Sequence, residues 1–419
     1  MNTRSKSILA TCLLALSAGA GVAQAETKVT FWHSFNKSSG EAIDQIIANF
    51  EAANPEIDIE GEYIGNYNDI VAKLQAAIPA KRAPDAVIME VTRYGLFADR
   101  GVLLDLTSYL DADPLKDELF DFAREVGVYE GKNYIVPFNS STPVFYANID
   151  LLKQAGYDDV PEMKSWAQLE EVAQTVTDAL GGDGIYGMVA PGQFARWGLI
   201  MDNDSDLIDT VSGEILIDAP RTVEAYQWMA SLVHDKKLAS PDGVADESKG
   251  KELFTQGKAA LMFDSTGSYG GLKSAMGDNL AVLPMPCNVV CRVPIGGAGI
   301  GILSTADADV QAAAYKFMSF AASAESNAIW FAATGYMPIN KQTAAQPLAV
   351  DALATQPGID VAIGQLDFAR GRPRPPVVTW MRATEYDMWQ AMALGQRDVT
   401  ETLTEFAAST RQEAERIAR

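Results

Sequence analysis

The sequence has few of the residues around which most enzyme active sites are built. Only two histidines, His33 and His234, occur among 419 residues, so little imidazole is available for acid–base catalysis. It lacks a His-Glu-x-x-His helix motif, a Gly-x-Ser-x-Gly elbow and a glycine-rich nucleotide loop with its lysine. These absences favour binding over turnover, and we expect no cofactor. A secreted carboxylate-dependent hydrolase stays open as an alternative, because acidic residues are abundant.

Cysteine is almost as scarce as histidine. Of the three cysteines, Cys12 lies near the N-terminus, and Cys287 and Cys291 are separated only by Asn-Val-Val. In an oxidising compartment such a pair is expected to form a disulfide that closes a short loop. A metal site is the weaker alternative, because neither histidine lies nearby in the sequence.

Long apolar runs are also missing, with one exception at the N-terminus. Arg4 and Lys6 precede an apolar run over 8–16, and small residues follow up to Ala25. This pattern is typical of a secretory signal peptide over residues 1–25, cleaved after Ala25, and the apolar run is too short to span a bilayer. We therefore expect a soluble protein exported to the periplasm.

Positive charge is in short supply. The chain has 33 lysines and arginines against 55 aspartates and glutamates, a formal net charge of −22. Such a chain has no long-range attraction to nucleic acid or anionic lipid. If it binds an anion, the positive potential has to be local, from a single placed arginine, helix N-termini or backbone N–H groups.

What the sequence does contain is an alternation of strand and helix patterns. Strand-like runs over 28–32, 57–63 and 86–89 are separated by helical periodicity over 41–52 and from Asn66 onwards. This order predicts an α/β lobe with a largely parallel sheet. Ligands of such sheets lie outside the carboxyl ends of the strands, where Tyr67 and Glu90 are expected.

The later part of the chain is richer in helices. Helical patterns cover 149–155, 165–180, 221–234, 310–322, 325–333, 380–394 and 399–417. With 419 residues, of which 48% are hydrophobic and 21% charged, the chain is long enough for two or three globular domains.

A polar elbow over residues 139–143 separates two strand-like runs a third of the way along the chain. Clusters of Ser, Asn and Pro usually form turns. We predict that the chain crosses here from one lobe to the other, with Ser141 facing a cleft. A second Ser/Thr/Gly elbow over 264–268 is interpreted as the return crossing. Lobe I is then expected to comprise residues 26–140 and 267–304, and lobe II residues 141–266 and 305–419.

Five short motifs occur in an order that resembles a known family. They are Phe31-Trp32-His33-Ser34, Gly65-Asn66-Tyr67, Pro137 to Pro143, Ile295-Gly296-Gly297-Ala298 and Thr334 to Ile339. Together they are similar to the periplasmic sn-glycerol-3-phosphate-binding proteins of ABC transporters, which are akin to maltose-binding proteins. The resemblance implies two α/β lobes joined by hinge crossings around a ligand cleft. The implied partners are the small solute itself and a membrane permease with its ATPase.

The resemblance also implies a set of ligand-binding residues. They are Tyr67, Glu90, Ser141, Ser265, Gly297, Tyr336 and Arg382, with Trp166 as an apolar wall. Arg382 suits a phosphate because its guanidinium can form two parallel hydrogen bonds. Glu90, which would repel a phosphate, suits the glycerol hydroxyls. Structural roles are the alternatives: a tyrosine or tryptophan can simply pack, and Arg382 can pair with Glu385 on its own helix.

Two departures from the family pattern leave the ligand open. The segment after Trp197 is shortened, and the Cys287–Cys291 loop is unexpected. The expected ligand is sn-glycerol-3-phosphate. The alternatives are glycerophosphodiesters such as glycerophosphocholine, a neutral sugar, or a purely structural exported protein.

Overall fold

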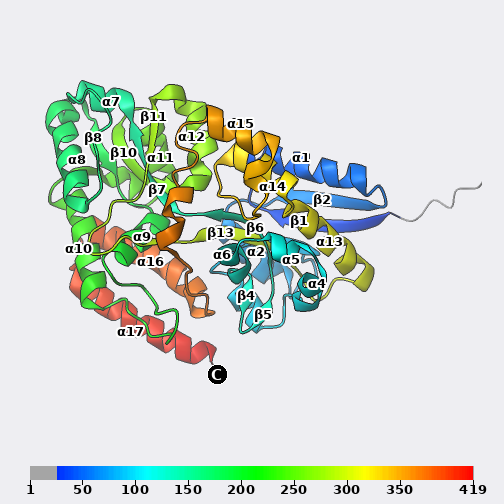
Figure 1. The fold of residues 1–419 in the computed structure, drawn as a ribbon. Coiled ribbons are helices and arrows are strands. Elements are labelled where there is room, and N and C mark those ends of the chain that lie inside the picture. The colour runs from blue at the N-terminus through cyan, green and yellow to red at the C-terminus, as the bar shows by residue number, and fades with distance from the viewer. Residues whose placement is uncertain (1–25, 419) are drawn as a thin grey trace, which may run out of the picture.

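The computed structural model describes residues 26–418. It consists of two lobes, each built around its own five-stranded β-sheet (Figure 1). In spatial order, the first sheet consists of β2 (Ile57–Tyr63), β1 (Thr27–His33), β3 (Ala86–Glu90), β13 (Gly296–Ile302) and β6 (Val136–Ser141). The second consists of β11 (Leu280–Leu283), β7 (Pro143–Asn148), β10 (Ala259–Ser265), β8 (Tyr186–Val189) and β9 (Ala239–Ser240). The predicted two-lobed α/β fold is confirmed.

The first sheet is parallel on one side and antiparallel on the other. β1 pairs in parallel with β2 and β3, whereas β13 runs antiparallel to both β3 and β6. Every residue of β3 is buried, as expected for a central strand. The carboxyl end of β3 therefore brings its last residue, Glu90, to the edge of the sheet that faces the second lobe.

Helices cover both sheets. Those of the first lobe are α1 (Lys37–Ala53), α2 (Tyr67–Ala77), α3 (Gly95–Asp99), α4 (Thr107–Ala112), α5 (Leu115–Glu118), α6 (Asp121–Glu125) and α13 (Ala308–Ala321). The second lobe holds α7 (Ile149–Gln154), α8 (Trp166–Leu180), α9 (Gln193–Asp202), α10 (Pro220–His234), α11 (Glu247–Thr255), α12 (Tyr269–Met276), α16 (Val377–Ala393) and α17 (Val399–Ile417). α14 (Ala324–Thr334) packs against elements of both lobes, and α15 (Pro347–Thr355) follows it. Two small sheets pair β4 (Val128–Tyr129) with β5 (Lys132–Asn133) and β12 (Val293–Pro294) with β14 (Ala369–Arg370).

The first crossing between the lobes lies at the polar elbow. β6 ends at Ser141 in the first sheet and β7 starts at Pro143 in the second, so Thr142 is the residue between the two sheets. The elbow is therefore an extended crossing and not a local turn, as predicted. Ser141 is buried at this point.

The return crossing was wrongly placed at residues 264–268. After β10 the chain stays in the second lobe, because β11 pairs antiparallel with β7. The chain returns to the first sheet only between β11 and β13, in the segment that holds the cysteine loop. The predicted lobe I segment 267–304 is thus divided between the two sheets.

The C-terminal part of the lobe assignment also needs correction. Residues 305–419 were assigned to lobe II, but α13 packs on the first sheet. The ring of Phe317 on α13 lies edge-on to Phe31 of β1 and Phe50 of α1, with ring centroids 5.5 and 5.4 Å apart. Burial of these aromatic rings holds α13 in the first lobe.

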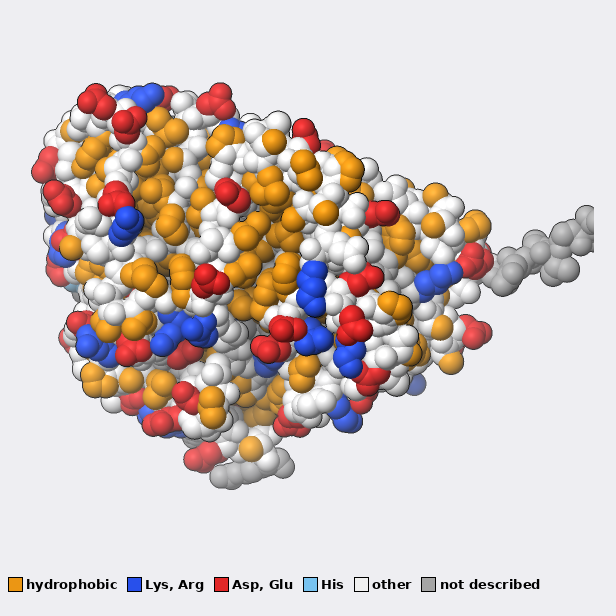
Figure 2. All heavy atoms as spheres, viewed as in Figure 1, with side chains coloured by type: hydrophobic (Ala, Val, Ile, Leu, Met, Phe, Trp, Pro, Cys, Tyr) orange, Lys and Arg blue, Asp and Glu red, His pale blue; other side chains and the backbone are white. Residues whose placement is uncertain are grey.

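The described residues on the face of the molecule toward the viewer form no continuous basic patch (Figure 2). Figure 2 shows acidic and basic side chains interspersed on this side of the molecule. Within residues 26–418, no helix combines the length and apolar composition needed to cross a membrane. The predicted signal peptide, residues 1–25, lies outside the described part of the chain.

Candidate functional site

One buried carboxylate lies between the two lobes among arginines from both. Glu90, at the end of β3, is only 6% exposed. From the second lobe, Arg382 on α16 donates from Nη1 to Glu90 Oε2 at 2.9 Å, and the Nη2 group of Arg372 pairs with Oε1. From the first lobe, the Nε atom of Arg93 lies 3.7 Å from Oε2. The ion pairs of Glu90 with Arg372 and Arg382 therefore span the two lobes.

This cluster carries more positive than negative charge. Burial alone would raise the pKa of Glu90, but Arg372, Arg382 and Arg93, with a hydrogen bond from Thr92, lower it to about 2. Burial and the mutual repulsion of the guanidiniums lower the pKa of Arg93 to about 9, and burial lowers that of Arg372 to about 10 despite its pairing with Glu90. One carboxylate thus faces three cations at neutral pH, which makes the site locally positive in a strongly acidic protein.

Two of these guanidiniums keep hydrogen-bonding capacity. The Nη1 group of Arg372 and the Nε group of Arg93 are buried and find no acceptor among the residues that the structure describes. The Arg372 guanidinium also lies over the rings of Phe194 and Trp197 on α9, at 4.9 and 5.2 Å from their centroids. Stacking on the two rings fixes the plane of the Arg372 guanidinium, and its Nη1 group stays available to donate to an anion.

A second group of polar side chains lies on the first-lobe side. The Tyr67 hydroxyl, Asn139 Nδ2 and Ser140 Oγ are buried, and none of them makes a hydrogen bond of normal geometry within residues 26–418. The nearest polar side chains to the Tyr67 hydroxyl are those of Ser34, Tyr336 and Asn139. Tyr67 and Tyr336 lie close enough for each to influence the other's ionisation. Burial raises the pKa of Tyr67 to about 12 and that of Tyr336 well above its usual value, so both hydroxyls stay protonated donors.

Gly297 adjoins this group in a conformation that favours glycine. Its φ is +110°, and a Cβ atom there would lie 2.2 Å from the Asn139 carbonyl oxygen. Neighbouring Ala298 donates its N–H to Asn139 Oδ1 at 2.9 Å, which fixes that side chain. The glycine thus allows β13 to pass close to the polar end of β6.

The two predicted serines have different surroundings. Ser141 is buried in β6, opposite Gly296 of β13. Ser265 is only partly buried, and its Oγ accepts from the Gly267 N–H at 3.1 Å. The hydroxyl of Ser265 is therefore already used in a local turn, whereas Ser141 lies at the crossing itself.

Trp166 is not brought to this site. Its ring packs in the core of the second lobe, stacked on Trp228 with centroids 4.1 Å apart. Trp166 was predicted to form an apolar wall of the site. In the structure it is the first residue of α8, and its ring packs against Trp228 of α10. The aromatic residues beside the arginines are Phe194 and Trp197 instead.

Sequence reasoning also missed Arg93 and Arg372. A signal for Arg372 was present, since it lies in the run Arg370-Gly-Arg-Pro-Arg-Pro-Pro, whose prolines stiffen the chain. Arg93 follows Glu90 by only three residues. Nothing in either local sequence indicates that both reach the same carboxylate.

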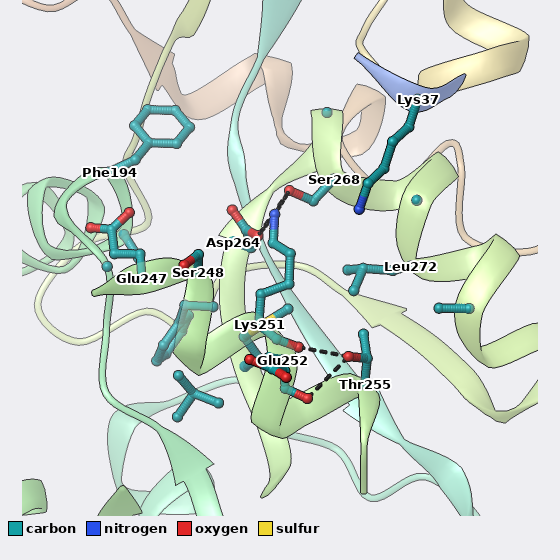
Figure 3. A pocket seen from close by; sticks show the side chains of 18 of the residues that line it. Lys37, Phe194, Glu247, Ser248, Lys251, Glu252, Thr255, Asp264, Ser268 and Leu272 are labelled. Atoms are coloured by element: carbon teal, nitrogen blue, oxygen red, sulfur yellow. Dashed lines mark hydrogen bonds and ion pairs between the residues drawn. The ribbon is translucent and has the colours of Figure 1, made fainter. Parts of the chain in front are cut away.

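A cavity of about 660 Å³ lies between the lobes (Figure 3). Lys37, at the start of α1, reaches into it from the first lobe, and Lys251 lies opposite, paired with Asp264 at 2.8 Å. Phe194 lines the cavity and also contacts Arg372, so it connects the two features. None of the predicted ligand-binding residues lines this cavity, although Asp264 is adjacent to Ser265. We therefore place the candidate site at the arginine cluster and regard the cavity as its neighbour.

The cysteine loop packs against the end of the helix that carries these aromatic residues. Cys287 and Cys291 are joined by a disulfide. The N–H groups of Val289 and Val290 both donate to the carbonyl of Asp202, the last residue of α9, at 3.0 Å.

Residues 26–418 contain no cluster of side chains suited to a metal ion.

The buried side chain of Asp202 yields a pH-dependent prediction. Neither carboxyl oxygen makes a hydrogen bond of normal geometry in the described chain. Burial raises the pKa of Asp202 well above 3.8, and the neighbouring Trp166 indole N–H opposes this only in part. Its contribution to stability is greatest below pH 3.8 and is lost as the pH rises through the folded-state pKa. Asp202→Asn should therefore raise the free energy of unfolding at pH 7.5 by about 1 kcal/mol. Urea unfolding at pH 4 and 7.5 checks this, and a difference that does not grow with pH would contradict it.

Comparison with known proteins agrees with this architecture. The bacterial extracellular solute-binding protein family matches residues 45–357. The sn-glycerol-3-phosphate-binding periplasmic protein UgpB of Escherichia coli K12 is 28% identical over 362 residues, which cover 83% of this chain and 82% of UgpB. UgpB of Shigella flexneri serotype 5b matches equally well, with the same identity and coverage.

Two solved structures illustrate the similarity of fold. The ABC substrate-binding protein Lmo0181 of Listeria monocytogenes, in complex with cycloalternan, aligns with a TM-score of 0.84 at 24% identity, over 93% of this chain and 99% of its own. UgpB of Mycobacterium tuberculosis, in complex with glycerophosphocholine, aligns with a TM-score of 0.82 at 23% identity, over 94% of this chain and all of its own.

Proposed function

The chain belongs to the bacterial extracellular solute-binding protein family, and from this premise we propose that it captures a phosphate ester of glycerol between its lobes. As a member of that family it is the substrate-binding component of an ABC importer and delivers its solute to the membrane permease without a chemical reaction. The proposed ligand is sn-glycerol-3-phosphate or a close glycerophosphodiester. The family and the UgpB relatives indicate the periplasm, and we propose that the signal peptide is cleaved after Ala25.

The observation that carries the proposal is the surplus of arginine around Glu90. A phosphate ester offers several strongly accepting oxygens, which match donors that the protein leaves unused, such as Arg372 Nη1 and Arg93 Nε. A neutral sugar would leave this buried positive charge uncompensated, at a cost in free energy. The site therefore supports an anionic ligand better than a neutral one.

The two sides of the site suggest an orientation for the ligand. We place the phosphate at the arginines and the glycerol hydroxyls near Tyr67, Tyr336, Asn139 and Ser140. Glu90 was predicted to bind the glycerol hydroxyls, but its oxygens are used by Thr92 and the arginines. We propose instead that Glu90 acts as the internal counter-ion that holds the guanidiniums in place.

The position of these groups on opposite lobes suggests how binding is coupled to closure. Glu90 and Arg93 belong to the first lobe, whereas Arg372 and Arg382 belong to the second. A ligand held by groups of both lobes binds the closed arrangement more tightly than the open one, so it shifts the population toward closure. The lobes would move about the crossing at Thr142.

Titration calorimetry of the exported protein tests the proposal. sn-Glycerol-3-phosphate or glycerophosphocholine should bind with a Kd at least about 100-fold lower than glycerol or maltose, since charge-assisted hydrogen bonds contribute several kcal/mol. The ligands are recovered after the titration and should be chemically unchanged. Preferential binding of maltose would replace the proposal with a sugar binder, and hydrolysed ester would indicate an enzyme.

A further inference from the structure

We propose that Gln193 is a positioning residue that directs the guanidinium of Arg382 toward the ligand. The inference rests on the proposed phosphate-ester site, because it concerns how that site is held in shape. Gln193 is the first residue of α9 and Arg382 lies on α16, 189 residues later in the chain. The two side chains are joined by a hydrogen bond.

The Gln193 amide makes all its side-chain hydrogen bonds to one turn of α16. Its Oε1 accepts from Arg382 Nε at 2.9 Å, and its Nε2 donates to the Arg382 carbonyl at 2.7 Å and to Glu385 Oε2 at 2.9 Å. Gln193 is 8% exposed, so little water is available to replace these bonds. One glutamine thus holds both the backbone and the side chain of Arg382.

Glu385 is the alternative partner for Arg382 on its own helix. Glu385 lies three residues further along α16, on the same side of the helix, where an arginine and a glutamate commonly pair. In this protein the Glu385 carboxylate accepts four hydrogen bonds, from Gln193, from the Nε and Nη2 groups of Arg196, and from Tyr226. With these sites occupied, Glu385 does not draw Arg382 away from the cleft.

The result is a fixed direction for a long, flexible side chain. With its Nε group bound to Gln193, Arg382 extends its Nη1 group to Glu90 Oε2 at 2.9 Å and Thr92 Oγ1 at 3.0 Å on the first lobe. Holding the guanidinium in this orientation before the ligand arrives lowers the entropy lost on binding. Gln193 acts only through Arg382 and need not touch the ligand.

A double-mutant cycle on the exported protein tests this role. With Arg382 intact, Gln193→Leu should weaken the binding of sn-glycerol-3-phosphate about tenfold, as expected for loss of a hydrogen bond to a charged group. In the Arg382→Ala background the same change should alter the Kd less than about twofold. An equal loss in both backgrounds would overturn the proposal. Gln193→Met, which keeps the side-chain length, replaces the leucine variant if that variant does not fold.

Gln365 provides a matched control. It is buried like Gln193, with no exposed surface at all, and its amide makes three hydrogen bonds, with Met285, Thr142 and Pro143, none of them with Arg382. Gln365→Leu should change the Kd for sn-glycerol-3-phosphate by the same factor in the wild-type and in the Arg382→Ala background. If the effect of Gln365→Leu on the Kd also depended on Arg382, the dependence seen for Gln193 would be a general effect of removing a buried glutamine, and the positioning role would be overturned.

A measurement without ligand separates this proposal from the proposed function. In protein labelled with ¹⁵N-arginine, the Nε–Hε resonance of Arg382 should exchange slowly with solvent. It should shift and exchange rapidly in Gln193→Leu but not in Gln365→Leu. An unchanged resonance in Gln193→Leu would overturn the positioning role. Failure of the wild-type protein to bind any phosphate ester would instead overturn the proposed function and leave this result standing.

Discussion

Replacing Glu385 by leucine should lower the free energy of unfolding by about 3–5 kcal/mol, because it leaves a buried guanidinium without its counter-ion. Arg196 is 1% exposed and donates to Glu385 Oε1 from Nε at 2.8 Å and to Oε2 from Nη2 at 2.6 Å. Water cannot reach Arg196 to compensate, and the Tyr226 hydroxyl loses its acceptor as well. Urea unfolding followed by far-UV circular dichroism measures the change.

Two control variants compare this buried ion pair with an exposed one. Removing both charges, in Arg196→Met/Glu385→Leu, should recover most of the loss, because no unpaired charge stays in the core. Glu405→Gln breaks the exposed pair with Arg397, whose atoms are 2.7 Å apart. It should change the stability by less than about 0.5 kcal/mol. If Glu385→Leu cost no more than Glu405→Gln, the buried network would not stabilise the second lobe.

Arg382→Ala should weaken phosphate-ester binding by at least ~2 kcal/mol, because a charge-assisted contact within a buried cluster is lost. The structure places the Arg382 side chain at the lobe interface, where it is 10% exposed and paired with Glu90. Glu90 keeps its bond to Arg372 in this variant, so the cluster is not left without a cation. Calorimetry with sn-glycerol-3-phosphate gives the change in affinity.

Substitution by lysine tests the geometry separately from the charge. Arg382→Lys should recover only part of the affinity, since a lysine cannot form the planar fork or bind Gln193 through an Nε–H group. Arg397→Ala removes an exposed arginine whose partner is Glu405 and not a residue of the cluster, so it should leave the affinity unchanged. A near-unchanged Kd in Arg382→Ala would remove Arg382 from the site.

Local patterns in the sequence predicted the elements well. The helical periodicity over 41–52 predicts one apolar face, and its residues Ile43, Ile46 and Phe50 are buried in α1. Ser165 caps α8 by accepting from the Gln168 N–H at 3.2 Å. The run over 86–89 is a fully buried central strand. Each of these features is determined by residues close together in the sequence. Hydrophobic periodicity and helix capping depend on such local residues, so the sequence is sufficient to predict them.

The arrangement of the site depended on contacts that local patterns do not report. Arg372 reaches Glu90 across 282 residues of sequence, and no periodicity links the two positions. The return crossing was misplaced because residues 280–283 look like any short strand, and only pairing with β7 shows to which sheet they belong. Trp166 and Phe194 are both large rings near the start of a helix, and only the packing of α8 and α9 shows which one reaches the cleft.

The crystal structure of the protein grown with sn-glycerol-3-phosphate tests the central claim most directly. We expect one intact molecule between the lobes, with its phosphate oxygens within hydrogen-bond distance of Arg372 and Arg382 and its hydroxyls toward Tyr67 and Tyr336. A ligand bound elsewhere on the protein, or a phosphate turned away from the arginines, would contradict it.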